Sequence, residues 1–156
     1  MEINIQQFKP AAIGKSKHAQ GVYQMVNPSK YNGSNPPVYR SSWELDFCRV
    51  CDLHPSVVYW CVEPFPIKYP CPIEGKLKNY WPDFLVQFKH TDGSVHTELI
   101  EIKPHKLTEA NTKSKKDKII VAINMAKWAA AKEFCDRNNI VFRILTEKEL
   151  YQGGKK

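Results

Sequence analysis

Apolar residues in the middle of the chain recur at spacings that predict a helix followed by strands. Trp43, Phe47 and Val50 lie four and three positions apart, which places them on one face of a helix. This helix is expected to begin near Ser41, because serine is a residue type that caps helix starts, and to end before the His54-Pro55 pair. The spacing therefore predicts a short first core helix between these two points.

Runs rich in β-branched and aromatic residues follow this helix and predict strands. Four extended segments are expected, at residues 57–62, 65–69, 80–89 and 96–103. Proline residues flank the first two segments and are taken as their ends, because proline cannot donate a hydrogen bond to a strand ladder. Asp92-Gly93 lies between the last two segments and is a strong signal for a tight turn, so these two are expected to form a hairpin.

Helical spacing returns in the second half of the chain. From Lys118 to about Arg137, apolar residues recur at intervals of three and four, at Ile119, Ile123, Ala126, Ala130 and Phe134. Residues 140–145 are expected to form a buried strand, and Thr146 with Glu149 has the pattern of a capping box that begins a short helix. The predicted order is therefore helix, strand meander, long helix, strand and final short helix.

Residues 1–38 differ in composition from the rest of the chain. They are rich in Lys, Asn, Gln, Ser and Pro, show no sustained apolar period, and contain four lysines against one acid. The chain has 156 residues, which suffices for a single hydrophobic core but not for two full domains. We therefore expect an irregular basic arm over residues 1–38 and one compact domain over residues 39–152.

The balance of charge indicates which class of partner to expect. The chain has 23 Lys and Arg against 16 Asp and Glu, a formal net charge of +7, and such a surface attracts nucleic acid or anionic lipid. No apolar run approaches the roughly 20 residues that span a bilayer, and residues 1–17 lack the apolar core of a secretory signal. These features favour a soluble intracellular protein.

The five cysteines form an odd set without the regular spacing of a secreted disulfide scaffold, so reduced thiols are expected at Cys48, Cys51, Cys61, Cys71 and Cys135. Cys48 and Cys51 have the spacing of half a zinc site that Cys61 or Cys71 could complete. No second CxxC or HxxxH pair follows. Two thiols packed on the helix are therefore the preferred interpretation, and no zinc is expected.

Asp83, Glu101 and Lys103 are the main candidates for chemistry. Cleavage of a phosphodiester needs a divalent cation that neutralises charge and acidifies water, and Mg²⁺ is usually held by one or two carboxylates. Because side chains alternate along a strand, Glu101 and Lys103 share one face, while Ile102 points to the other and leaves its carbonyl available to a metal. In this arrangement Asp83 and Glu101 would bind the metal, and Lys103 would orient or help deprotonate the attacking water.

These acids also have simpler interpretations. A Glu and a Lys two positions apart on a strand commonly form a solvated pair, although the apolar neighbours of Glu101 favour a buried functional role. Asp83 could be a turn residue. Glu44 lies three residues after Ser41, so it could complete a capping box, or it could lend a third carboxylate to the metal. Glu63 could do the same, but the proline after it favours a strand-end role.

A basic loop lies between the last hairpin strand and the long helix. The residues expected to contact DNA phosphates are Arg40, Lys106, Lys113, Lys115, Lys116 and Lys118. The alternative is a loop that only aids solubility. His105 could shuttle a proton or bind phosphate, although an exposed histidine is the default expectation. No recognition helix or zinc finger is found, so low sequence specificity is expected.

A set of motifs spreads over residues 39–147: Tyr39-Arg40-Ser41, Trp43-Glu44, Glu74-Gly75-Lys76, Asp83, Ile100-Glu101-Ile102-Lys103-Pro104 and Phe142-Arg143-Ile144-Leu145-Thr146-Glu147. Their order resembles the PD-(D/E)XK nuclease superfamily, and in detail they are similar to the head completion nucleases of T4-like tailed phages. The superfamily fold is α/β (α+β), with a restriction-endonuclease-like αβββαβ core in which helices flank a central mixed sheet. The resemblance does not include residues 1–38 or the Cys48 and Cys51 pair.

The resemblance implies a Mg²⁺-dependent deoxyribonuclease, with Mn²⁺ able to substitute, whose catalytic set is Glu44, Asp83, Glu101 and Lys103. It also implies endonuclease and exonuclease activity on packaged DNA before heads join tails. The implied partners are DNA and the head, portal or neck proteins, and the implied location is the host cytoplasm or the virion. The sequence leaves the oligomeric state open.

Two other functions stay open. One is a non-catalytic DNA-binding protein of the capsid portal or neck, in which the carboxylates only support the fold, and the intact catalytic set argues against it. The other is the endonuclease subunit of cut-and-paste transposons, which has a similar layout and similar residues over positions 129–147. That function requires a partner that recognises transposon ends.

Overall fold

Four strands form one mixed sheet in the computed structural model, which describes residues 20–108 and 114–152. In the order of the sheet, these strands are β3 (Val57–Val62), β6 (Phe84–Lys89), β7 (Val95–Ile102) and β8 (Val141–Leu145). The pairs β3–β6 and β6–β7 are antiparallel, and Gly93 in the β6–β7 turn has a φ of 89°, which suits glycine. β8 runs parallel to β7, because a helix carries the chain across the sheet between them.

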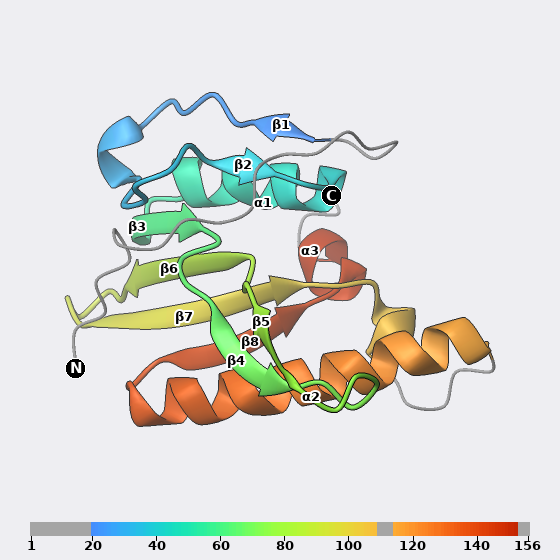
Figure 1. The fold of residues 1–156 in the computed structure, drawn as a ribbon. Helices are drawn as coiled ribbons and strands as arrows, with labels where there is room; N and C mark the ends of the chain where they lie inside the picture. Colours follow the sequence, from blue (N-terminus) through green and yellow to red (C-terminus); the bar gives the residue numbers. More distant parts are fainter. Residues whose placement is uncertain (1–19, 109–113, 153–156) are drawn as a thin grey trace.

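Helices cover both faces of this sheet (Figure 1). α1 (Ser42–Leu53) packs on one face, and α2 (Lys115–Arg137), which connects β7 to β8, packs on the other. The short α3 (Glu147–Gln152) follows β8, and the amide of Thr146 donates to the Glu149 carboxylate at 2.7 Å. This bond confirms the capping box predicted there.

Alternation along the strands divides the core into two layers. Residues of β3, β6 and β7 with even numbers lie in the layer under α1: Trp60, Val62, Phe84, Val86, Ile100 and Ile102. Their odd-numbered neighbours lie in the layer under α2: Cys61, Leu85 and Leu99. A shift of one residue would exchange the two faces, so the strand register decides which helix each side chain meets. Glu101 therefore faces the α2 side.

A separate antiparallel hairpin packs against α2 and consists of β4 (Ile67–Pro70) and β5 (Leu77–Tyr80). The predicted single strand over residues 80–89 is wrong at its beginning, because Tyr80 ends β5 and β6 begins at Phe84. Pro82 lies in this break and cannot donate a ladder hydrogen bond. The prediction missed β5, and it placed the strand before it over residues 65–69 rather than Ile67–Pro70.

Residues 20–38, which the sequence assigns to an irregular arm, lie against α1. They hold only short regular elements, namely β1 (Gly21–Val22), the 3-10 helix η2 (Pro28–Lys30) and β2 (Val38–Tyr39). The Tyr23 hydroxyl and the Val26 amide each donate to Asp52 Oδ2 at 2.7 Å, and the Asn27 amide donates to Asp52 Oδ1 at 2.9 Å. Asp52 has no exposed surface, so this segment covers it. The preceding part of the expected arm lies outside the described residues.

The predicted fold class, a central mixed sheet flanked by helices, is confirmed. The predicted first helix matches α1, whereas α2 begins at Lys115 rather than Lys118. Ser114 explains this earlier start, because its hydroxyl accepts the Asp117 amide at 3.2 Å and caps the helix. The five cysteines are buried free thiols, and Cys48 and Cys51 belong to α1 and point into the core layer between α1 and the sheet. None of the helices described is long and apolar enough to cross a membrane.

Candidate active site

Asp83 lies directly before β6, where two hydrogen bonds fix it. Its carbonyl accepts the Glu63 amide at 2.9 Å, which extends the β3–β6 pairing by one residue. Its carboxylate Oδ2 accepts the amide of Ile102 at 2.7 Å. The Asp83 carboxylate is therefore held at the end of β7, next to Glu101.

Glu101 is only 4% exposed and lies on the α2 side of β7. Its Oε1 accepts a hydrogen bond from the Tyr80 hydroxyl at 2.7 Å, and its Oε2 lies 3.3 Å from Lys103 Nζ. The side chain of Ile102 points to the opposite face, into the layer under α1. The structure thus confirms the predicted alternation, in which Glu101 and Lys103 meet on one face.

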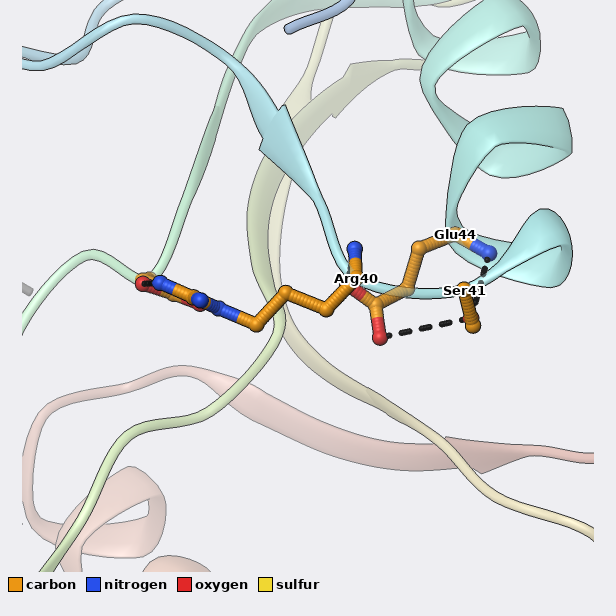
Figure 2. Close-up of polar contacts among 4 residues, drawn as sticks. Arg40, Ser41 and Glu44 are labelled. Atoms are coloured by element: carbon orange, nitrogen blue, oxygen red, sulfur yellow. Dashed lines mark hydrogen bonds and ion pairs between the residues drawn. The ribbon is translucent and has the colours of Figure 1, made fainter. Parts of the chain in front are cut away.

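Glu44 lies in the first turn of α1, and its partners are those of a helix start. Its amide donates to Ser41 Oγ at 3.1 Å, and its carboxylate accepts the Arg40 amide at 3.2 Å and the Ser41 hydroxyl at 3.4 Å. Figure 2 shows the Glu44 carboxylate turned back toward Ser41 and Arg40. The capping interaction expected at this helix is present, although the carboxylate reaches the amide of Arg40 rather than that of Ser41.

The three carboxylates affect one another electrostatically. Burial raises the pKa of Asp83 well above its ordinary value, and repulsion from Glu101 and Glu44 raises it further. Burial also raises the pKa of Glu44, with added repulsion from Glu63 and Glu101. Burial likewise raises the pKa of Glu101, although the Lys103 ammonium partly opposes this change. The acids predicted from distant parts of the sequence therefore interact electrostatically with one another.

This group of acids fits a hard divalent cation. Carboxylate oxygens are the ligands that Mg²⁺ prefers, and a cation would relieve the repulsion that raises these pKa values. Over residues 20–108 and 114–152, no group of three or more His, Cys, Asp and Glu side chains could by itself hold a metal ion. Mg²⁺ is usually held by one or two carboxylates, with water and substrate completing its shell, and Asp83 and Glu101 could supply these two.

Arg40, which the sequence predicts as a DNA contact, pairs with an acid of the protein. Its Nε lies 2.5 Å from Glu63 Oε1, and its Nη2 donates to Glu63 Oε2 at 3.2 Å. Glu63 has a positive φ of 43°, which is unusual for a residue other than glycine. The Arg40 side chain extends away from Glu44 (Figure 2). Its guanidinium thus has a structural partner that sequence spacing does not reveal.

The predicted phosphate-contacting lysines lie in two neighbouring elements. Lys106 belongs to the 3-10 helix η3 (His105–Leu107), and the exposed lysines of the first turn of α2 are Lys115, Lys116 and Lys118. The Asn124 side chain donates to the Leu107 carbonyl at 3.1 Å and so links η3 to α2. The remaining predicted contact, Lys113, lies outside the described residues.

His105, which follows Lys103 by two positions, interacts with α3. Its amide donates to Glu147 Oε1 at 2.8 Å, and its ring Nε2 lies 3.2 Å from Lys148 Nζ. These contacts attach η3 to α3. His105 is therefore half-buried and holds neighbouring elements together, whereas the default expectation was a fully exposed histidine.

Sequence reasoning missed two residues of the site, Tyr80 and Lys127. Tyr80 is 3% exposed and donates its hydroxyl proton to Glu101, as described above. Lys127 lies on α2 with Nζ 5.6 Å from the centre of the Tyr80 ring and 5.7 Å from that of Tyr69. Burial lowers the pKa of Lys127, and repulsion from Lys103 lowers it further. The only signal in the sequence is a lysine on the apolar side of a helix, next to Trp128.

An open hollow of about 720 Å³ lies between α2 and β8 and is lined largely by apolar atoms of residues such as Trp128, Phe142 and Ile144. Neither Asp83 nor Glu101 lines it. Phosphodiester chemistry requires charged groups around the phosphate. The carboxylates and lysines at the end of β7, rather than this hollow, therefore form the candidate active site.

Two comparisons with known proteins cover this region. The family model described as the TnsA-like endonuclease N terminal matches residues 54–147, which include Asp83, Glu101 and Lys103 but not Glu44. The head completion nuclease of Enterobacteria phage T4 is 36% identical over 142 residues, which cover 83% of this chain and 92% of that protein. The similarity thus extends well beyond the few residues of the site.

Proposed function

Because the chain belongs to the TnsA-like endonuclease N-terminal family and to the family of the phage T4 head completion nuclease, we propose that it is a metal-dependent DNA nuclease acting in phage head completion. The observation that carries the proposal is the set of contacts at the end of β7. There Asp83 accepts the amide of Ile102, and Glu101 lies 3.3 Å from Lys103. This arrangement suits hydrolysis of a phosphodiester bond.

In this proposal, Asp83, Glu101 and the backbone carbonyl of Ile102 hold Mg²⁺, and Mn²⁺ can replace it. The cation supplies charge neutralisation at the phosphate and acidifies water. Glu44 would add a third carboxylate from α1 through a water molecule in the shell of the cation, for which its electrostatic interaction with Asp83 and Glu101 is the support. The Tyr80 hydroxyl occupies Glu101 Oε1, which leaves Oε2 directed toward Lys103.

Lys103 acts on the substrate side of the site. Its ammonium lies beside Glu101 at the surface of the sheet, and it orients the attacking water and stabilises the negative charge on the phosphate. Hydrolysis adds the oxygen of this water to phosphorus and breaks the bond to the leaving sugar oxygen, while the water gives up one proton and the leaving oxygen takes one up. The carboxylates and the lysine thus divide metal binding from substrate binding.

The lysines at the start of α2 and in η3 extend the cationic surface for DNA. Lys106, Lys115, Lys116 and Lys118 contact phosphates without reading bases, so binding has low sequence specificity and weakens as the salt concentration rises. Both endonuclease and exonuclease activities belong to the proposal. So do the head, portal or neck proteins as partners in the host cytoplasm, because the T4 relative is named for head completion.

A second candidate function is that of a transposase-type endonuclease subunit. The family match over residues 54–147 favours it. The two candidates share their chemistry and differ in partner. A subunit whose partner must recognise the transposon ends would cleave little DNA alone. The leading proposal instead expects cleavage by the isolated protein.

The test uses purified protein with supercoiled plasmid and with end-labelled linear DNA, in Mg²⁺, Mn²⁺ or EDTA. Wild type is expected to nick the plasmid only with metal, and Asp83→Asn and Lys103→Met are expected to lose at least about 100-fold in rate. Asp136→Asn, the same change at an exposed position of α2, is the matched control and keeps full activity. Equal activity in all variants, or activity in EDTA, would contradict the proposal. Bound but uncut DNA would instead favour a non-catalytic protein of the portal or neck, or a subunit that cleaves only with its partner.

A further inference from the structure

Lys127 lies on α2, the helix that covers the face of β7 to which Glu101 points. Its side chain is partly buried, and its ammonium lies over the rings of Tyr69 and Tyr80. Such cation–π contacts hold the ammonium group in place, but the rings carry no negative charge of their own. Its position is therefore set by the β4–β5 hairpin beneath it.

Lys127 shares the acids of the site with Lys103. Over residues 20–108 and 114–152, the ion pairs within 4.0 Å do not include Lys127. It interacts at longer range with Glu101 and Asp83, and Lys103 repels it. The acids that partly neutralise these two cations are the proposed metal ligands, so a bound metal would leave both ammonium groups in need of another anion. In an enzyme that acts on DNA, the phosphate of the substrate is such an anion.

Tyr80 connects this lysine to the acids. Its hydroxyl donates to Glu101 Oε1 at 2.7 Å, while its ring lies under the ammonium of Lys127. One side chain thus orients a carboxylate with its polar end and supports a cation with its aromatic face. The ring and the hydroxyl can be separated experimentally, because phenylalanine keeps the first and lacks the second.

We propose that Lys127 is a second phosphate-binding cation of the active site, opposite Lys103, and that Tyr80 is the positioning residue that seats Lys127 and orients Glu101. This inference rests on the proposed nuclease function for the identity of its ligand. Lys103 and Lys127 would hold the substrate phosphate from the strand side and the helix side. Loss of Lys127 would then weaken DNA binding even without metal, whereas loss of the Tyr80 hydroxyl would affect Glu101 alone.

The experiment compares Lys127→Met, Lys127→Gln, Lys127→Arg and Tyr80→Phe with wild type. Binding of a fluorescein-labelled duplex is measured by anisotropy in EDTA, and kcat and KM are measured with Mg²⁺. Removal of one charged phosphate contact is expected to weaken metal-free binding about tenfold and to raise KM. Lys127→Arg is expected to recover most of this binding. Tyr80→Phe is expected to bind DNA within about twofold of wild type and to lower kcat about tenfold.

Lys132→Met is the matched control, because Lys132 is an exposed lysine of the same helix that pairs with Asp136. It removes the same charge from the chain, so general electrostatic attraction predicts equal effects at both positions, and that result would overturn the inference. Failure of Lys127→Arg to recover binding would also overturn it. Urea denaturation of each variant separates misfolding from lost contacts. If wild type cuts no DNA, the proposed function fails, while the binding measurement in EDTA still decides the role of Lys127.

Discussion

Glu44 and Asp83 differ in the protein partners that hold their carboxylates. The Glu44 carboxylate accepts hydrogen bonds from the Arg40 amide and the Ser41 hydroxyl, whereas Asp83 has the Ile102 amide at 2.7 Å. At Glu44, a capping role and proximity to other acids occur in the same side chain. The two interpretations that its sequence position allows are therefore not exclusive. Its contribution to metal binding stays a proposal.

A first prediction concerns the ion pair between Arg40 and Glu63. The side chains are 25% and 12% exposed, so solvent screens the pair only in part. Arg40→Met and Glu63→Met are each expected to lower the free energy of unfolding by about 1–2 kcal/mol, because each leaves a charged partner without these hydrogen bonds. Urea denaturation of both variants and of the double variant measures the coupling between the two residues.

The exposed pair of Lys132 and Asp136 is the control for this double-mutant cycle and is expected to show little coupling. One outcome would instead support the contact with DNA phosphate that the sequence predicts for Arg40. If Arg40→Met keeps wild-type stability but weakens DNA binding, the guanidinium serves the substrate rather than Glu63.

At the scale of elements, two serines determine where the main helices begin. Ser41 Oγ accepts the Glu44 amide at 3.1 Å at the start of α1, and Ser114 Oγ accepts the Asp117 amide at 3.2 Å at the start of α2. Both helix starts matter for the proposed function, because α1 presents Glu44 and α2 presents three exposed lysines in its first turn. The two capping serines therefore stabilise the helix turns that carry residues of the proposed site.

A second prediction compares Ser41→Ala with Ser114→Ala. Each change removes one capping hydrogen bond and is expected to lower the free energy of unfolding by about 1 kcal/mol. Only Ser41→Ala also removes a hydroxyl from the Glu44 carboxylate. At saturating DNA and well below the unfolding temperature, Ser41→Ala is therefore expected to lower the kcat of plasmid nicking, whereas Ser114→Ala, which loosens only the turn that carries DNA-contacting lysines, is expected to keep kcat and to raise KM. Equal rates for the two variants would show that Ser41 acts on stability alone.

At the scale of the whole molecule, one buried acid of α1 gathers several of the hydrogen bonds that attach residues 20–38 to the rest of the chain. Asp52 receives the Tyr23 hydroxyl and two backbone amides, and Lys30 Nζ donates to the Asp52 carbonyl at 3.0 Å. Burial alone would raise the pKa of Asp52. The hydrogen bonds from Val26, Tyr23 and Asn27 outweigh that effect, so the pKa of Asp52 lies below its ordinary value.

A third prediction follows for the dependence of stability on pH. A lowered pKa in the folded state means that the Asp52 carboxylate stabilises the fold above its unfolded pKa of about 3.9. This stabilisation is lost as the pH falls below about 4, through the lower folded pKa, because the carboxylate then takes up a proton. Asp52→Asn is expected to be about 1–3 kcal/mol less stable than wild type at pH 7, with a smaller difference at pH 3.

Urea denaturation at pH 7, 5 and 3 measures this change. Asp136→Asn, at an exposed position of α2, is the control and is expected to follow wild type at each pH. A difference between Asp52→Asn and wild type that stays constant from pH 7 to pH 3 would show that packing, rather than the charge of Asp52, joins residues 20–38 to α1.

The sequence by itself determined the main elements and the strand face on which the chemistry lies. Helical spacing predicted α1 and most of α2, because one apolar stripe must meet the core. Strand alternation placed Glu101 and Lys103 together and turned Ile102 away, since the two-residue period does not depend on the rest of the fold. These are local properties, and local spacing is enough to decide them.

Only the tertiary structure decided which side chains meet across the chain. The pairing of Arg40 with Glu63, the cover of Asp52 by residues 20–38, and the position of Lys127 over Tyr80 each join distant segments. Their distances depend on how the β4–β5 hairpin packs on α2 and how residues 20–38 pack on α1. Sequence spacing carries no information about such packing, because it arises from the burial of whole faces rather than from the order of neighbouring residues.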